Sequence, residues 1–115
     1  MENGTFDRRA LLEKFGGDEE FMRALLDVAL RTSAPLPAAL RSACAQADFA
    51  VLAGLAHKVK GTAGDLVATA VQTRARDAEL AARACDPGAV GLNLELADAL
   101  DEMLEEIRTE VAGAG

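Results

Sequence analysis

Residues 48–67 read DFAVLAGLAHKVKGTAGDLV, a stretch that combines a helical apolar stripe with an unusual set of glycines. In a helix, successive residues turn by about 100° around the axis. His57 then lies about 140° from Leu52, the origin of the apolar stripe. The other side chains of that stripe fall within about 60° of Leu52 and are Leu55, Ala56, Val59, Ala63 and Leu66. The pattern predicts a helix that turns the only histidine of the chain toward solvent.

The positions around His57 on this outer face carry almost no side chains. They are Ala53, Gly54, Gly61 and Gly64. A glycine inside a helix costs about 0.8–1 kcal/mol relative to alanine, and exposed helix positions usually carry Glu, Lys, Gln or Arg. A bare surface around one nucleophile suits a second protein that must press its active site against it. The residues alone leave open that His57 is an ordinary surface residue and that Gly64 ends the helix.

The sequence before this stretch divides into helical segments at glycines and prolines. A short first helix is expected over residues 5–15, with Thr5 as its N-cap and a glycine pair as its stop. Asp18 is the expected N-cap of a second helix. Pro35 and Pro37 interrupt the apolar periodicity of that helix, which resumes after them. Either a bent continuous helix or two abutting helices would satisfy this pattern.

The sequence from Asp48 onward predicts three more helices. Asp48 is the expected N-cap of the histidine-bearing helix. Thr69 and Gln72 fit a capping box, which predicts that the next helix starts there and runs to about Cys85. A last helix is expected over residues 90–111. Together with the scarcity of aromatic and β-branched residues, this predicts an all-α fold: one domain over residues 1–115, an up-down four-helix bundle with a short N-terminal capping helix.

The net charge of the chain is −7, which argues against a nucleic-acid partner and against an anionic membrane surface. No apolar run approaches the length of a transmembrane helix, and the first residues do not resemble a signal peptide. Cys44 and Cys85 are expected to be small buried thiols, so the sequence predicts a cytoplasmic protein. The acidic residues crowded on the last helix fit a solvated outer face better than a site for a basic partner.

Residues 56–66 read AHKVKGTAGDL, and this run resembles the signature of histidine phosphotransfer (HPt) domains, roughly A-H-x-L-K-G-x-x-G-x-[LI]-G-A. Two positions depart from the pattern: Val59 replaces Leu, and Val67 stands where the family commonly has glycine. The matching positions are Ala56, His57, Lys60, Gly61, Gly64, Leu66 and Ala68. The resemblance extends to the length of the chain and the order of its expected helices.

The resemblance implies a function for the outer face of this helix. His57 would accept a phosphoryl group from an aspartate of a response-regulator receiver domain, and Lys60 would offset the charge of the phosphoryl oxygens. A receiver or a hybrid histidine kinase would be the partner. The expected docking residues are Ala53, Gly54, Lys58, Gly61 and Gly64.

The same resemblance predicts a phosphoryl carrier rather than an enzyme. The sequence offers no phosphate-binding loop, no nucleotide-binding glycine pattern and no metal-ligand set. Any Mg²⁺ is therefore expected on the receiver, and the carrier itself needs no cofactor.

Two other classes of protein remain open at this point. One is a degenerate bundle that binds receivers without accepting phosphate, although such a protein would have no need of His57 or Lys60. The other is the dimerisation and phosphoacceptor domain of a histidine kinase, which needs two chains to complete its bundle. Four helices in one chain favour a monomer, and the molar mass in solution would separate the two.

Overall fold

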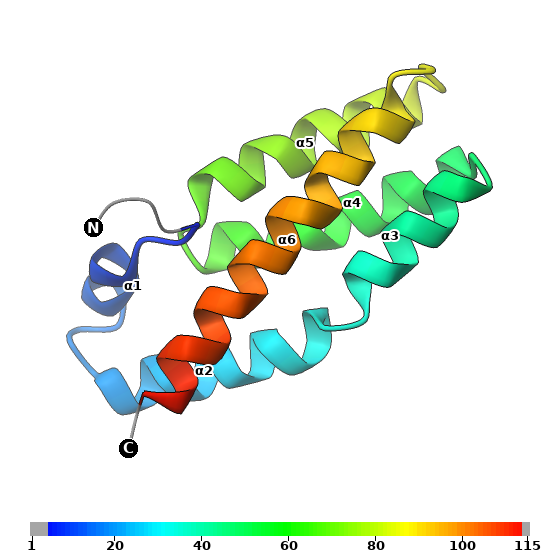
Figure 1. The fold of residues 1–115 in the computed structure, drawn as a ribbon. Helices are drawn as coiled ribbons and strands as arrows, with labels where there is room; N and C mark the ends of the chain where they lie inside the picture. Colours follow the sequence, from blue (N-terminus) through cyan, green and yellow to red (C-terminus); the bar gives the residue numbers. More distant parts are fainter. Residues whose placement is uncertain (1–4, 114–115) are drawn as a thin grey trace.

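The computed structural model describes residues 5–113, which form helices joined by short turns (Figure 1). No strand occurs within this range, so the expected all-α fold is confirmed. None of its helices is long and apolar enough to cross a membrane. In chain order the helices are α1 (Arg8–Lys14), α2 (Glu19–Ser33), α3 (Leu36–Ala45), α4 (Phe49–Asp65), α5 (Thr69–Arg83) and α6 (Ala89–Ala112).

Two of the expected helix starts are confirmed. The Asp18 carboxylate accepts the backbone N–H of Phe21 at 3.0 Å at the start of α2. The Asp48 carboxylate accepts the N–H of Val51 at 3.2 Å at the start of α4. Each aspartate therefore satisfies one of the free N–H groups of a first helical turn.

The cap expected for the first helix is wrong. Asp7, not Thr5, caps α1, because its carboxylate reaches the N–H of Ala10 at 2.9 Å. The backbone N–H of Thr5 instead donates to the carboxylate of Glu106 on α6, at 2.7 and 2.9 Å. A better-placed acidic cap two residues further on therefore decides where this helix begins.

The capping box expected at the start of α5 is also wrong. Ala68 occupies the N-cap, where no side chain makes a capping hydrogen bond, and Thr69 is already the first helical residue. The side chain of Gln72 turns toward α4 instead, where its Nε2 lies 2.5 Å from the place a Cβ on Gly64 would take. A capping box needs its threonine at the N-cap, but Thr69 lies one position after the N-cap of this helix.

The prolines separate two helices. α2 ends at Ser33 and α3 begins at Leu36, with Pro35 at the N-cap and Pro37 in the first turn. Proline fits there because the first turn of a helix has no internal partner for its N–H groups. Of the two arrangements that the sequence allowed, abutting helices are the one that forms.

The turn after α4 decides the position of Val67. Its N–H donates to the carbonyl of Gly64 at 3.2 Å, and the N–H of Ala68 donates to that of Ala63 at 2.8 Å. This Schellman motif places Val67 at φ 57, in the left-handed region. Gly64 therefore lies inside the helix, and the possibility that it ends α4 is wrong. The glycine common in the family at the position of Val67 has a plain reason, since glycine adopts this φ without strain.

One apolar core runs through the described residues. α4 and α5 pack along their length, which the small side chains of Ala75, Ala78 and Ala82 permit. α6 lies against α2, α3 and α5, and α1 adds the fully buried Leu11 (Figure 1). Cys44 is buried as expected, but Cys85 is exposed in the turn after α5. This packing fixes the faces of α4 and α5 that meet beside His57.

Candidate functional site

His57 lies near the middle of α4, and 62% of its side chain is exposed. Its environment is more structured than the sequence suggested, because its Nδ1 lies 3.1 Å from Oε2 of Glu79 on α5. The imidazole therefore leans toward α5 on one side while its remaining surface stays open to solvent.

Glu79 is a buried carboxylate between α4 and α5. The residue is only 5% exposed, although it belongs to a helix whose outer positions are well solvated. Its neighbours on the same face of α5 are the alanines of the close helix packing, Ala75, Ala78 and Ala82. A charge in such a place needs partners, because burying an unpaired carboxylate is strongly unfavourable.

Two cations supply that pairing. The Nζ of Lys60 lies 2.9 Å from Oε1 of Glu79. Arg83, one turn further along α5, donates to Oε2 from Nη2 at 2.6 Å and from Nε at 2.9 Å. Lys60 was expected to face a phosphoryl group on His57, and in the unphosphorylated protein it is paired with Glu79 instead.

The charge on Glu79 decides which nitrogen of His57 carries the proton. The ammonium of Lys60, supported by Arg83 and opposed by burial, lowers the pKa of Glu79 to about 2. The carboxylate is therefore ionised at neutral pH and can only accept hydrogen bonds. It follows that Nδ1 of a neutral His57 holds its hydrogen and donates it to Glu79, which leaves the lone pair on Nε2.

The glycines expected beside His57 do leave an open surface. Apart from the two adjacent residues and the backbone of α4 itself, no atom lies within 4 Å of the place where a Cβ on Gly54 or Gly61 would stand. Both residues are exposed, and so is Lys58. Since the fold would accommodate a side chain at either glycine, packing does not explain them. We call Gly54, Gly61 and Gly64, together with His57, the bare surface.

Two of the expected docking positions differ from the helical-wheel picture. Ala53 is only 5% exposed, so its expected place on the open face was wrong. The reason is the close approach of α5, since Ala53 borders Ala82 and Arg83 there. Gly64 is half-buried, and only the flexible end of the Gln72 side chain lies over it.

An open hollow of about 450 Å³ lies beside His57. It extends from the bare surface across to the junction of α2 and α3. Its lining residues are Thr32, Ser33, Leu36, His57, Lys58, Gly61, Thr62 and Asp65. The imidazole therefore stands at the edge of a shallow depression that another molecule could enter.

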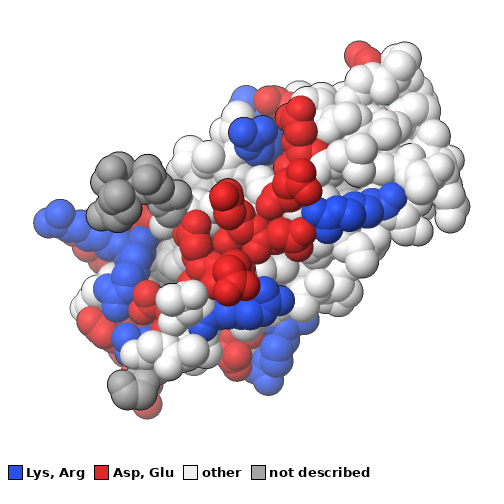
Figure 2. All heavy atoms as spheres, in the orientation of Figure 1, with Lys and Arg blue, Asp and Glu red and all other residues white. Residues whose placement is uncertain are grey.

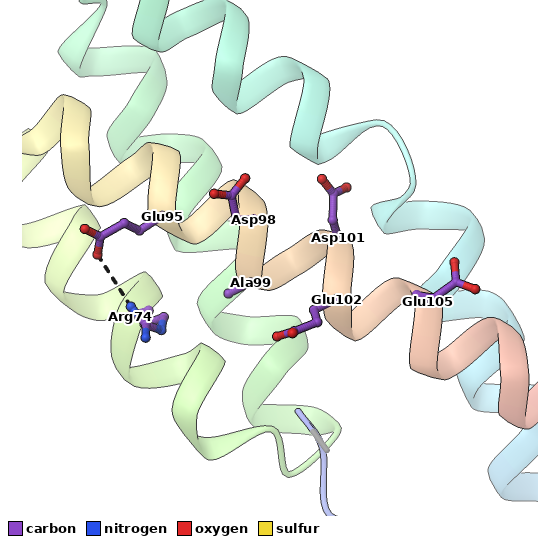
Figure 3. A pocket seen from close by; sticks show the side chains of 7 residues that line it. All are labelled: Arg74, Glu95, Asp98, Ala99, Asp101, Glu102 and Glu105. Carbon is purple, nitrogen blue, oxygen red and sulfur yellow. Dashed lines mark hydrogen bonds and ion pairs between the residues drawn. The ribbon is translucent and has the colours of Figure 1, made fainter. Parts of the chain in front are cut away.

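A second hollow, of about 850 Å³, has no histidine in its lining and is strongly acidic. It lies along α6, where acidic side chains gather over the middle of the face drawn in Figure 2. Figure 3 shows them projecting from α6, with Arg74 of α5 3.5 Å from the nearest. We call Glu95, Asp98, Asp101, Glu102 and Glu105 the acidic ridge. Among the described residues, no three His, Cys, Asp or Glu side chains gather as metal ligands.

The sequence matches the family model of the Hpt domain over residues 24–110, which span the bare surface and the Glu79 network. The chain belongs to the Hpt family. This Hpt domain is similar in fold to the crystal structure of histidine-containing phosphotransfer protein B (HptB) from Pseudomonas aeruginosa PAO1, with a TM-score of 0.82. The two chains share 20% identity over 99% of this chain and 100% of that one, a likeness of fold alone. No curated protein sequence matches this one significantly.

Membership in the family states what kind of protein this Hpt domain is. It is a histidine-containing phosphotransfer protein of a phosphorelay. Hpt proteins carry phosphoryl groups rather than catalyse a reaction, and they work with receiver domains and kinases. The function that the sequence motif implied is therefore confirmed at the level of the family.

Sequence reasoning missed Glu79 and Arg83. The signal that could have found the glutamate is its position, since it interrupts the alanine stripe of α5 with the only charge on that face. Arg83 follows Glu79 by four residues, the spacing at which two helical side chains pair. Neither residue belongs to the motif around the histidine.

Proposed function

We propose that His57 is the phosphoacceptor and that Nε2 is the atom that receives the phosphoryl group. The observation that carries this proposal is the exposed imidazole with its Nδ1 held 3.1 Å from a buried, ionised carboxylate. That arrangement presents a lone pair outward in one fixed orientation, as a nucleophile requires. A degenerate binding module would gain nothing from it.

During the transfer step no proton leaves His57. The lone pair of Nε2 attacks the phosphorus of an aspartyl phosphate on a receiver, so that the N–P bond forms as the P–O bond to the aspartate breaks. The receiver aspartate leaves as a carboxylate. The imidazole keeps its Nδ1–H and becomes positively charged, and Glu79 stabilises this charge through the same hydrogen bond. The reverse reaction returns the phosphoryl group to a receiver.

Lys60 supplies the second electrostatic contribution. It follows His57 by three residues on the same helix, and its ammonium can neutralise phosphoryl oxygens that develop charge during transfer. Transfers of this type depend mainly on positioning and charge neutralisation rather than on covalent chemistry by the protein.

The docking surface, the partner and the cofactor follow from the same site. The bare surface and Lys58 would contact a receiver domain, alone or as part of a hybrid kinase, because a receiver must bring its aspartate against Nε2. Ala53 lies too deep to contribute more than its edge. Any Mg²⁺ that the transfer needs would be bound by the receiver, and the Hpt domain would act as a carrier without an ATP site.

We also propose that residues 1–115 act as one domain and as a monomer in the cytoplasm. Counted with α2 and α3 as one element, the order of the helices supports an up-down bundle of four, the other three being α4, α5 and α6. The buried Leu11 supports α1 as the cap of this bundle. A molar mass of one chain in solution would support the monomer, whereas two chains would favour the kinase dimerisation domain.

Phosphotransfer from phosphorylated receivers of the source genome tests the function directly. The parent should gain an acid-labile, base-stable label from at least one receiver, and His57→Gln should gain none. The thermal stability of His57→Gln should change by less than about 0.5 kcal/mol, as is usual for an exposed position. Label of this kind on His57→Gln would contradict the assignment.

A further inference from the structure

The buried carboxylate of Glu79 has three partners, and orienting His57 explains only one of them. Lys60 pairs with Oε1, whereas His57 and Arg83 both contact Oε2. If Lys60 neutralises a phosphoryl group on His57, it has to move away from Glu79. A buried carboxylate abandoned by its cation is strongly unfavourable. A second cation must therefore stay with Glu79 when Lys60 moves away.

Arg83 is placed to be that second cation. It belongs to the same helix as Glu79 and follows it by one turn, so its contact does not depend on α4. Its guanidinium gives two hydrogen bonds to Oε2, at 2.6 and 2.9 Å, in a geometry that the planar group holds well. Lys60 offers a single ammonium on a flexible stem, from the helix that also carries His57.

We propose that Arg83 is a positioning residue, which holds the Glu79 carboxylate in place and thereby releases Lys60 to the phosphoryl group on His57. The proposal rests on the proposed function, in which His57 Nε2 is the acceptor. The hydrogen bonds of Arg83 at this site go to Glu79 Oε2, and none goes to His57. Lys60 exchanges one anionic partner for another, while Glu79 keeps Arg83 and the Nδ1–H of His57 throughout.

The exchange can be observed without any receiver, because the chain has only three lysines, Lys14, Lys58 and Lys60. Phosphoramidate would phosphorylate His57 directly, and the ¹⁵N shift of Lys60 Nζ would be followed through its non-exchanging methylene protons. The shift should move on phosphorylation in the parent and move far less in Arg83→Gln, where Glu79 retains Lys60. A Lys60 signal that moves equally in Arg83→Gln, or that does not move in the parent, would overturn the proposal.

Arg76→Gln is the matched control. It removes the same charge from the same helix, but among residues 5–113 Arg76 pairs only with Asp77, at 3.7 Å. Lys60 should respond to phosphorylation in this variant as it does in the parent. Arg83→Lys keeps a cation near Glu79 and should restore part of the response. Arg83 is more than half exposed, so these variants should keep the fold, which circular dichroism would check.

Transfer kinetics from a receiver give the second measurement. Arg83→Gln should slow transfer to His57 roughly tenfold, the scale of one charge-assisted hydrogen bond. Adding Arg83→Gln to Glu79→Gln should cause no further loss, because Lys60 is already free without the carboxylate. Additive losses would contradict action through Glu79. If no receiver labels the parent, the proposed function fails, while the phosphoramidate experiment still decides the role of Arg83.

Discussion

The outer faces of α4 and α6 are both exposed, yet their compositions are opposite. On α4 several positions around His57 are glycines, and a Cβ added at Gly54 or Gly61 meets no other element within 4 Å. On α6 the acidic ridge fills the face with carboxylates (Figure 2). Such a ridge is common on a solvated helix face, because charged side chains are more stable in water than in the protein interior. Gly54 and Gly61 cost helix stability without helping the packing, which supports the proposed contact with another molecule.

The largest effect should come from filling the bare surface. Gly61→Leu should reduce transfer from a receiver by roughly a hundredfold, because a displacement of even about 1 Å at a reacting pair has that scale of effect. Its thermal stability should be unchanged or higher, by up to about 0.8 kcal/mol. Reaction of His57 with phosphoramidate should change much less. Melting curves, receiver titration and the two labelling assays measure these quantities.

Gly91→Leu is the control for this substitution. Gly91 is an exposed glycine of α6, and a Cβ there also meets no other element within 4 Å. The control should transfer like the parent. If Gly61→Leu melted lower yet bound a receiver normally, the glycine would serve the fold, and the contrast between the two faces would lose its functional meaning.

A smaller effect is expected from the charge beside His57. Lys60→Ala should slow transfer roughly tenfold and shorten the lifetime of the phosphorylated form. Lys60→Arg should recover part of the rate and Lys60→Glu should be the slowest, as charge neutralisation requires. Rates equal to that of the parent in all three variants would reduce Lys60 to a structural partner of Glu79.

The next effect is on stability and depends on pH. Because the folded protein lowers the pKa of Glu79 from 4.5 to about 2, its ionised carboxylate stabilises the fold above pH 4.5. This contribution is lost as the pH falls toward 2. The parent should therefore exceed Glu79→Gln in stability by an amount that shrinks by roughly 3 kcal/mol between pH 6 and pH 2. Denaturant unfolding at several pH values measures it, and a constant difference would mean that Glu79 is not held ionised.

The smallest effect is expected on the acidic ridge. Glu102→Gln combined with Glu105→Gln should leave transfer unchanged and alter stability by no more than about 0.5 kcal/mol per substitution. The same labelling and melting assays apply. A marked loss of transfer would make the ridge a partner surface, and the two faces would then share one role.

Helix positions and the exposed histidine could be predicted from the sequence because they depend on local signals. Asp18 and Asp48 cap their helices through neighbouring backbone groups, which the order of residues alone specifies. Ala53 could not be placed correctly, because its burial depends on how closely α5 approaches α4. The partnership of His57 with Glu79 depends on the same approach, across two helices and a turn.

The network around Glu79 also changes what the motif means. The motif names Lys60 for its position near His57, but the structure gives that lysine a competing partner on α5. Charge alone did not reveal this competition, because Glu79 is one of many acidic residues in a chain of net charge −7. Its place among the alanines of α5 was the informative feature.

Thermal stability alone would favour glycine in the left-handed turns after the helices and other residues inside the helices, and this chain has the reverse at several positions. Helices α3, α4 and α5 end with non-glycine residues at positive φ: Ala47, Val67 and Cys85. Each costs on the order of 1 kcal/mol relative to glycine, while the bare surface keeps glycines inside a helix. Ala47→Gly and Cys85→Gly therefore offer an engineer a reserve of stability away from the bare surface. Such a stabilised background would tolerate any destabilising variant at the bare surface, and so let docking be measured apart from folding.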